Sequence, residues 1–133
     1  MWADLTRVPR ACWLEPGDPA VPLNTCYVLR CPNVEDAQAI AALLNSPLAA
    51  AWLRSLAEPA RGRYCRLLAW TTALLPLPAD WERARAILAP LGVQGAQGEP
   101  PGSAELLDAA LAAYRVRHLD VAPLLEWHAP DVR

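Results

Sequence analysis

The tripeptide Asn45-Ser46-Pro47 constrains the fold of this chain more than any other feature of its sequence. Proline has no backbone N–H and disfavours the α conformation in the residue before it, so a helix arriving from the N-terminal side must end here. Serine is a favoured N-cap, and proline is favoured at the first position of a helix. The tripeptide therefore predicts two helices that meet at a fixed corner.

Apolar residues recur at helical spacing on both sides of this corner. The first helix is predicted to begin after an N-cap at Asn33, and the second is predicted to end at Glu58-Pro59. Two further helices are predicted over residues 80–91 and 103–114. A short final helix is predicted from Asp120.

Three segments have the composition of strands. Residues 23–30 carry Thr, Tyr and Val between two prolines, and residues 64–68 alternate polar and apolar side chains after a turn at Gly62. Residues 67–77 form an apolar run that predicts a buried strand. Together the elements predict a mixed α/β (α+β) fold, in which a small mixed sheet packs with several helices.

The length of 133 residues is that of one ordinary domain. Residues 92–102 are rich in glycine and proline, which predicts a flexible linker. We therefore expect an α/β domain over residues 1–91 and a C-terminal helical segment over residues 103–133. That segment is expected to pack on the domain or on a partner.

All 12 basic residues are arginine, and the formal net charge is −2. Non-specific DNA binding grows with the number of phosphates that a protein neutralises, so an acidic chain is not expected to bind DNA in this way. Arginine suits bidentate recognition of phosphate and guanine, but a GC-rich genome also explains its use. The composition is compatible with nucleic acid without arguing for it.

Several classes of site are not expected. The four cysteines and two histidines lack the paired spacing of zinc sites, so we expect no metal and interpret the thiols as buried or idle in a reducing cytoplasm. No uncharged apolar stretch reaches the roughly 18 residues of a membrane helix, which predicts a cytoplasmic protein without membrane contact. The GxSxG, P-loop and GxGxxG motifs are absent, so we expect no catalytic residue and no cofactor in this chain.

The densest basic cluster lies between Arg54 and Arg66, where Glu58 is the only acidic residue. Its candidate nucleic-acid-binding residues are Arg54, Arg61, Arg63, Tyr64 and Arg66. Arginines on a loop and a strand edge can contact phosphates or bases, and each bidentate contact with guanine gives about 1–3 kcal/mol of discrimination. The alternative interpretation is a solvated charged face.

Three of the tryptophans lie on apolar faces of predicted elements: Trp52, Trp70 and Trp81. Tryptophan can provide a stacking platform for a base, but its large apolar ring is more often part of a core. We therefore expect these three side chains in the core.

The order of four motifs resembles a known family. The motifs are LNTCYVL, AALLNSPLAAAWL, ARGRYCR and TTALLPLP, and a helix follows the last of them. This order is similar to that of the C-terminal part of the target recognition domain of N6-adenine DNA methyltransferases in restriction-modification and phage-defence systems. The specificity subunits of type I systems show a similar order. The resemblance covers about residues 22–90, with a weaker match at Trp2–Leu5.

The resemblance implies a mixed α/β recognition domain that reads double-stranded DNA from the major groove. In this comparison Arg61–Arg66 matches a DNA-facing segment, whereas Leu43–Ser46 matches a structural corner. The Asn-Pro-Pro-Tyr catalytic signature and the cofactor-binding motif of the methyltransferases are absent. The chain is therefore expected to be non-catalytic by itself, and to act with a catalytic methyltransferase domain or subunit.

Two other functions remain open. The Ala/Leu-rich helices are compatible with a protein-interaction or scaffold subunit that makes no contact with nucleic acid. A small hydrolase or binding protein of unrecognised type is the third possibility. The sequence does not name the DNA site, and residues 103–133 have no counterpart in the resemblance.

Overall fold

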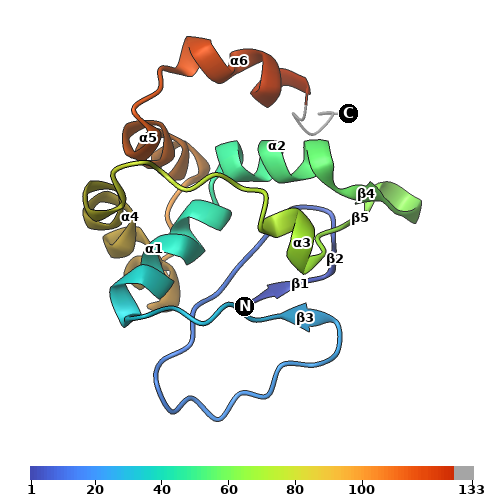
Figure 1. Ribbon diagram of the computed structural model, residues 1–133, viewed down its shortest axis with the longest axis vertical. Coiled ribbons are helices and arrows are strands. Elements are labelled where there is room, and N and C mark those ends of the chain that lie inside the picture. The colour runs from blue at the N-terminus through green and yellow to red at the C-terminus, as the bar shows by residue number, and fades with distance from the viewer. Residues whose placement is uncertain (128–133) are drawn as a thin grey trace.

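The computed structural model describes residues 1–127, and this part of the chain holds six α-helices and two small antiparallel sheets (Figure 1). The helices α1, α4 and α5 gather on one side of the molecule, while the strands lie on the other side (Figure 1). The predicted α+β class is confirmed.

The predicted corner joins helix α1, Val34–Leu44, to helix α2, Pro47–Leu56, and the two are bent by 71°. The side chain of Ser46 accepts a hydrogen bond from the first turn of α2 and donates one of 2.7 Å to the carbonyl of Leu43. Ser46 is fully buried, so its hydroxyl satisfies backbone groups that water cannot reach. Proline and serine thus fix the corner as the sequence predicts.

Helix α4, Trp81–Ala96, lies along α1 and forms the most extensive helix packing in the fold. The two backbones touch at Gly92, where an added Cβ would lie 2.2 Å from the carbonyl oxygen of Gln38. The prediction that a flexible linker begins at residue 92 is wrong, because the helix continues for another turn. The glycine that suggested flexibility serves instead for close packing.

Helices α5, Ser103–Tyr114, and α6, His118–Trp127, complete the described part. Helix α5 packs on α4 and supplies residues to the main core, whereas α6 lies over α2 and has no fully buried residue (Figure 1). The fully buried part of that core consists of Ala39, Ala42, Leu43, Leu48, Ala84, Leu88, Ala89, Leu106, Ala110, Leu111 and Ala113. The predicted helices from residues 103 and 120 are therefore present, and residues 128–133 of the predicted segment lie outside the described residues.

The five strands are each two residues long. Strand β1, Trp2–Ala3, pairs with β3, Cys26–Tyr27, in one sheet. The second sheet has the order β2, β5, β4, which are Leu5–Thr6, Cys65–Arg66 and Glu58–Pro59. The strand predicted over residues 23–30 is therefore reduced to two residues, because its only described partner, β1, is equally short.

The buried strand predicted over residues 67–77 is wrong. Leu67 donates its N–H to the carbonyl of Asp4, and the chain then turns into the short helix α3, Ala69–Thr72. No strand pairs with residues 68–77 in the described part of the chain, so the backbone forms local helical hydrogen bonds instead. A short apolar run cannot distinguish these two outcomes.

Replacement of Gly92 by alanine is expected to destabilise the fold. The added methyl group meets the backbone of Gln38, which cannot move as a flexible side chain would, so the free energy of unfolding should fall by about 1–3 kcal/mol. Urea unfolding measures this change. Gly95→Ala is the matched control, because its nearest neighbour would be 3.9 Å away in the same helix, and it should leave stability unchanged or raised. Equal stability of the two variants would contradict the close contact.

Tyr114 provides a pH-dependent contact between α5 and the loop before α4. Its hydroxyl donates a 2.6 Å hydrogen bond to the carbonyl of Pro76, and burial raises the pKa of Tyr114 to about 12 from an ordinary value of 10.0. Because the folded state favours the protonated phenol, this contribution to stability is complete below pH 10.0 and is lost as pH rises to about 12. Urea unfolding should show this alkaline loss in the wild type and a smaller one in Tyr114→Phe. Identical pH profiles of unfolding free energy in the two proteins would contradict a role for the Tyr114 hydroxyl.

Candidate nucleic-acid interface

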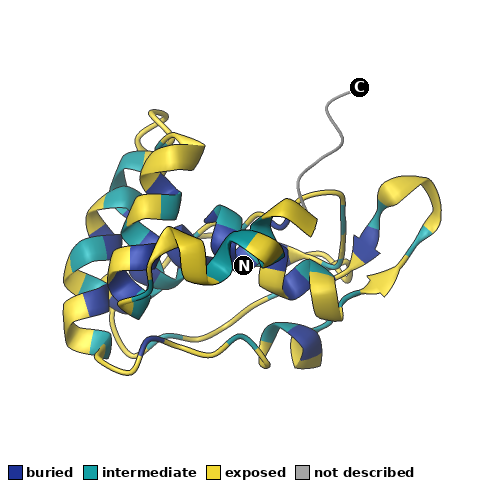
Figure 2. Ribbon diagram, turned by 90° about the horizontal axis from the view of Figure 1, so that it is seen from above, coloured by how far each residue is buried: buried dark blue, intermediate teal, exposed yellow. Residues whose placement is uncertain are grey.

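A β-hairpin carries the centre of the predicted basic cluster. Strands β4 and β5 are joined by a 3₁₀ turn over Arg61–Arg63, and the N–H of Ala60 donates a 2.7 Å hydrogen bond to the carbonyl of Tyr64 across its base. Figure 2 shows the hairpin extending away from the helices, with exposed residues over its tip. The structure thus brings three of the five predicted residues together on one projection: Arg61, Arg63 and Tyr64.

The tip has an unusual backbone conformation. Gly62 has φ of 73°, as its position in the predicted turn requires, and Arg63 follows with φ of 66°. Two successive residues with positive φ are typical of the tight hairpin turns that match the twist of the strands. For a residue with a side chain this conformation costs about 1–2 kcal/mol, so Arg63 introduces backbone strain at the tip.

Arg66 is placed at the base of the hairpin instead of its tip. Its guanidinium donates to both carboxylate oxygens of Asp4, with distances of 2.5 Å from Nη2 and 3.4 Å from Nε. These hydrogen bonds raise the pKa of Arg66 above its ordinary value. Arg66 therefore ties the hairpin to the N-terminal segment, a role that the cluster in the sequence does not indicate.

Arg54 is separated from the tip by its position on α2. It is half-buried and lines a cavity between residues 8–14 and the helices. Burial raises the pKa of the Cys65 thiol, and the positive charge of Arg54 opposes part of that rise. The structure therefore distributes the predicted cluster over a tip, a base and a cavity wall.

Sequence reasoning missed Arg7, which joins the tip residues from the N-terminal segment. Its guanidinium carbon lies 4.8 Å from the centre of the Tyr64 ring, in a cation–π contact. The pairing of Thr6 with Cys65 brings these neighbours together. Because Arg7 and Tyr64 are far apart in the sequence, only knowledge of the pairing between β2 and β5 could have identified this contact.

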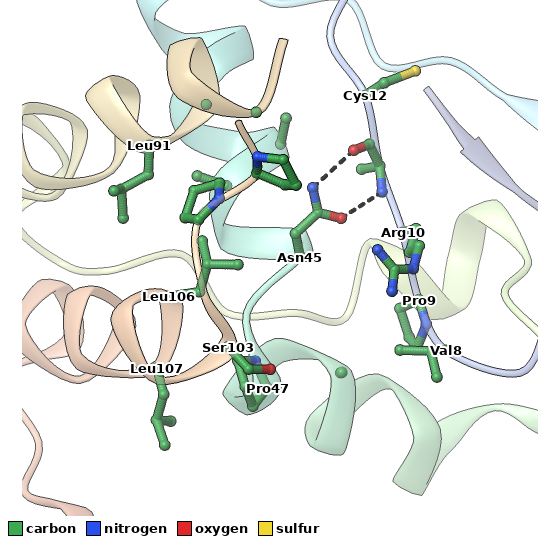
Figure 3. A pocket seen from close by; sticks show the side chains of 18 of the residues that line it. Val8, Pro9, Arg10, Cys12, Asn45, Pro47, Leu91, Ser103, Leu106 and Leu107 are labelled. Atoms are coloured by element: carbon green, nitrogen blue, oxygen red, sulfur yellow. Dashed lines mark hydrogen bonds between the residues drawn. The ribbon is translucent and has the colours of Figure 1, made fainter. Parts of the chain in front are cut away.

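A cavity of about 1030 Å³ lies between residues 8–14 and helices α1, α2, α4 and α5 (Figure 3). Its walls are mainly apolar, with Arg10 and Arg54 among the polar groups. Asn45 also lines it, but its amide accepts from the N–H of Ala11 at 2.7 Å and donates to the carbonyl of Ala11 at 2.9 Å. This amide is therefore engaged in holding the chain together (Figure 3).

The described residues contain few other groups for chemistry. Among residues 1–127, no group of three or more His, Cys, Asp or Glu side chains is arranged to hold a metal ion, and the four cysteines are free. No single helix in this part is long and apolar enough to cross a membrane, and only the bent pair of α1 and α2 meets that requirement together.

Exposed large apolar side chains lie on α2, on α3 and on the residues after α3, and together they are called the exposed apolar face. It consists of Trp52, Leu56, Trp70, Leu74 and Leu77. The indole N–H of Trp52 donates to the carbonyl of Leu74 at 3.4 Å, which places these two residues side by side. The core prediction is wrong for Trp52 and Trp70, which are 37% and 55% exposed, whereas Trp81 packs against the main core.

Comparison with protein-family models, with curated proteins and with solved structures found no match to this chain.

The substitution Asn45→Asp tests the amide that holds Ala11. Aspartate keeps an acceptor for the N–H of Ala11 but, when ionised, faces the Ala11 carbonyl with an oxygen instead of a donor. The free energy of unfolding at neutral pH should fall by about 1–3 kcal/mol, as urea unfolding would show. The deficit should shrink below about pH 4, where the protonated carboxyl can donate again. Asn24→Asp makes the same change of charge on an exposed loop and should be nearly neutral; an equal loss in both variants would argue against the Asn45 contact.

Proposed function

We propose that this chain is a DNA-sequence-recognition module of an adenine-specific DNA methyltransferase or of a related restriction-modification or phage-defence system. The observation that carries the proposal is the projecting hairpin with Arg61 and Arg63 at its tip. Two features support it independently of each other. The order of the motifs resembles target recognition domains, and the backbone at Arg63 accepts strain to present a long cationic side chain.

The two-stranded form of the hairpin suits the major groove of DNA. That groove is about 12 Å wide and admits a two-stranded β-ribbon, and arginine at its floor can bind guanine through two hydrogen bonds. Both arginines are exposed and lie on either side of Gly62, which has no side chain of its own and against which the Tyr64 ring rests. The tip therefore presents two exposed cationic side chains on a narrow projection.

The module would perform no chemistry of its own. Its role would be to hold a duplex in register while a catalytic methyltransferase domain or subunit turns an adenine out of the stack. The exposed apolar face of α2 and α3 offers a surface for that partner, since tryptophan is frequent at the centre of protein interfaces. A cytoplasmic location follows from this role, because both host and invading DNA are found there.

The double variant Arg61→Gln/Arg63→Asn tests DNA binding. Asparagine is chosen at position 63 because it tolerates positive φ, so the turn should persist while the charge is removed. Anisotropy of a labelled duplex of mixed sequence should show weaker binding, and the slope of log affinity against log salt should fall by about 0.9 for each phosphate that the variant no longer neutralises. If the residues read bases, selection from a random duplex pool should show preference relaxed by about 1–3 kcal/mol for each base that is no longer read.

The matched control is Arg30→Gln/Arg117→Gln, which removes the same charge from exposed positions outside the hairpin. It should retain most of the affinity and slope. Equal binding by both double variants would count against the proposal.

A scaffold function without DNA contact is the second candidate, and the exposed apolar face is the observation in its favour. Light scattering distinguishes it in the same preparations. A stable complex that forms without nucleic acid, together with unchanged DNA titrations in the hairpin variant, would select the scaffold instead.

A further inference from the structure

Arg7 and Tyr64 form a cation–π pair beside the tip of the hairpin. Arg7 is exposed, and it follows strand β2, while Tyr64 precedes strand β5 beside it. The guanidinium lies over the face of the ring at 4.8 Å from its centre. The ring attracts the positive charge without taking up the N–H groups in hydrogen bonds to oxygen, so these groups can still donate.

The other charged groups near this pair are already engaged or lie apart from Arg7. Asp4 is paired with Arg66, and Glu58 stands opposite Arg66 in the strand pairing. Within residues 1–127, Arg7 makes no ion pair and donates no hydrogen bond to a carboxylate. The result is an ordered cation whose donors face solvent, immediately beside the tip of the hairpin.

We infer that Arg7, held over Tyr64, is a phosphate-binding residue that sets the position of the hairpin on a DNA duplex. This inference rests on the proposed function and adds a division of roles to it. Arg61 and Arg63 at the tip reach into the groove, whereas Arg7 lies beside the base of the turn, where the phosphate backbone at the edge of the groove passes. Phosphate contacts fix position without selecting sequence, so Arg7 contributes affinity and Arg63 contributes preference.

The ring of Tyr64 acts through Arg7 and is therefore a positioning residue. An exposed arginine loses side-chain entropy of up to about 2 kcal/mol when it binds a ligand in one conformation. Stacking on Tyr64 restricts the guanidinium before DNA arrives, so less entropy is lost on binding. Tyr64 is itself fixed because its carbonyl closes the hairpin through the N–H of Ala60.

Four variants of the full chain test the inference by anisotropy with a labelled duplex: Arg7→Gln, Arg7→Lys, Tyr64→Leu and the double variant Arg7→Gln/Tyr64→Leu. Arg7→Gln should weaken all duplex sequences equally and lower the salt slope by about 0.9, the value for one phosphate. Arg7→Lys should keep the slope but lose affinity, because an ammonium lacks the planar fork. Tyr64→Leu should likewise keep the slope and lose affinity.

A double-mutant cycle gives the decisive result. Once Arg7 is glutamine, Tyr64→Leu should have no further effect on DNA affinity. A persistent effect would show that Tyr64 contacts DNA itself, and the positioning role would be wrong. Urea unfolding of each variant confirms that the comparison is made between folded proteins.

The outcomes separate this inference from the proposed function. If Arg61→Gln/Arg63→Asn weakens DNA binding and Arg7→Gln does not, the phosphate role of Arg7 is overturned while DNA recognition stands. If neither changes binding, the proposed function fails and the inference fails with it. If Arg7→Gln changes the preferred sequence instead of the affinity for all sequences, Arg7 reads bases and the division of roles is wrong.

Discussion

The amide of Asn45 holds the segment around Ala11 against the corner between α1 and α2. By bonding both the N–H and the carbonyl of Ala11, it occupies the place that a neighbouring strand would take. Ala11 forms a bridge with Trp2 in β1, and the chain passes from there into β2, which pairs with β5 of the hairpin. The Asn45 amide thus acts together with the buried cluster of Trp2, Leu44, Leu53, Cys65 and Leu67 in fixing the strands that carry the basic tip. The sequence Leu44-Asn45-Ser46 therefore has a structural role here that does not require contact with DNA.

The hairpin itself is held by few interactions. Its ladder to the N-terminal segment is two residues long, and the pair of Asp4 and Arg66 adds a contact at the surface. Exposed ion pairs contribute at most about 1 kcal/mol, so most of the anchoring comes from the buried side of β5. There Cys65 and Leu67 pack with Trp2, whose indole donates to the Leu67 carbonyl at 3.0 Å. One face of the hairpin base is thus fixed in a buried cluster separate from the main core, and the tip is left to solvent.

The helices were predictable because their signals are local. Asn33, Ser46 and Asp80 accept the hydrogen bonds expected of N-caps, and apolar periodicity located the faces between them. The strands were not, since a strand requires a partner and the sequence does not show where pairing stops. Residues 67–77 illustrate this limit, because their apolar character suits a strand or a helical turn equally well. Gly92 illustrates a second limit of prediction from sequence. Glycine is typical both of a flexible linker and of a close backbone contact such as that with Gln38, so its presence does not distinguish the two.

The candidate site likewise has a part that could be predicted from the sequence and a part that could not. The tip residues adjoin one another in sequence, so Arg61, Arg63 and Tyr64 could be identified together. The partners that define the roles of Arg66 and Tyr64 are Asp4 and Arg7, and these come from the N-terminal segment, about 60 residues earlier in the chain. No composition or spacing within the cluster contains that information. These contacts form only in the folded chain, where β2 pairs with β5.

The placement of charge also gives the molecule a preferred orientation in an electric field. Its net charge is −2, yet the hairpin carries the exposed residues Arg61, Arg63 and Arg66 against one exposed acid, Glu58. On the other side Glu35, Glu82, Glu105 and Asp108 are exposed on helices α1, α4 and α5, and they outnumber the exposed Arg83 and Arg115 there (Figure 1). Near any extended polyanion the acidic side is repelled and the hairpin is attracted, so the molecule rotates before it touches. Encounters would then begin with the tip already facing its target. The acidic body, which weakens indiscriminate adhesion, at the same time orients the molecule during its approach.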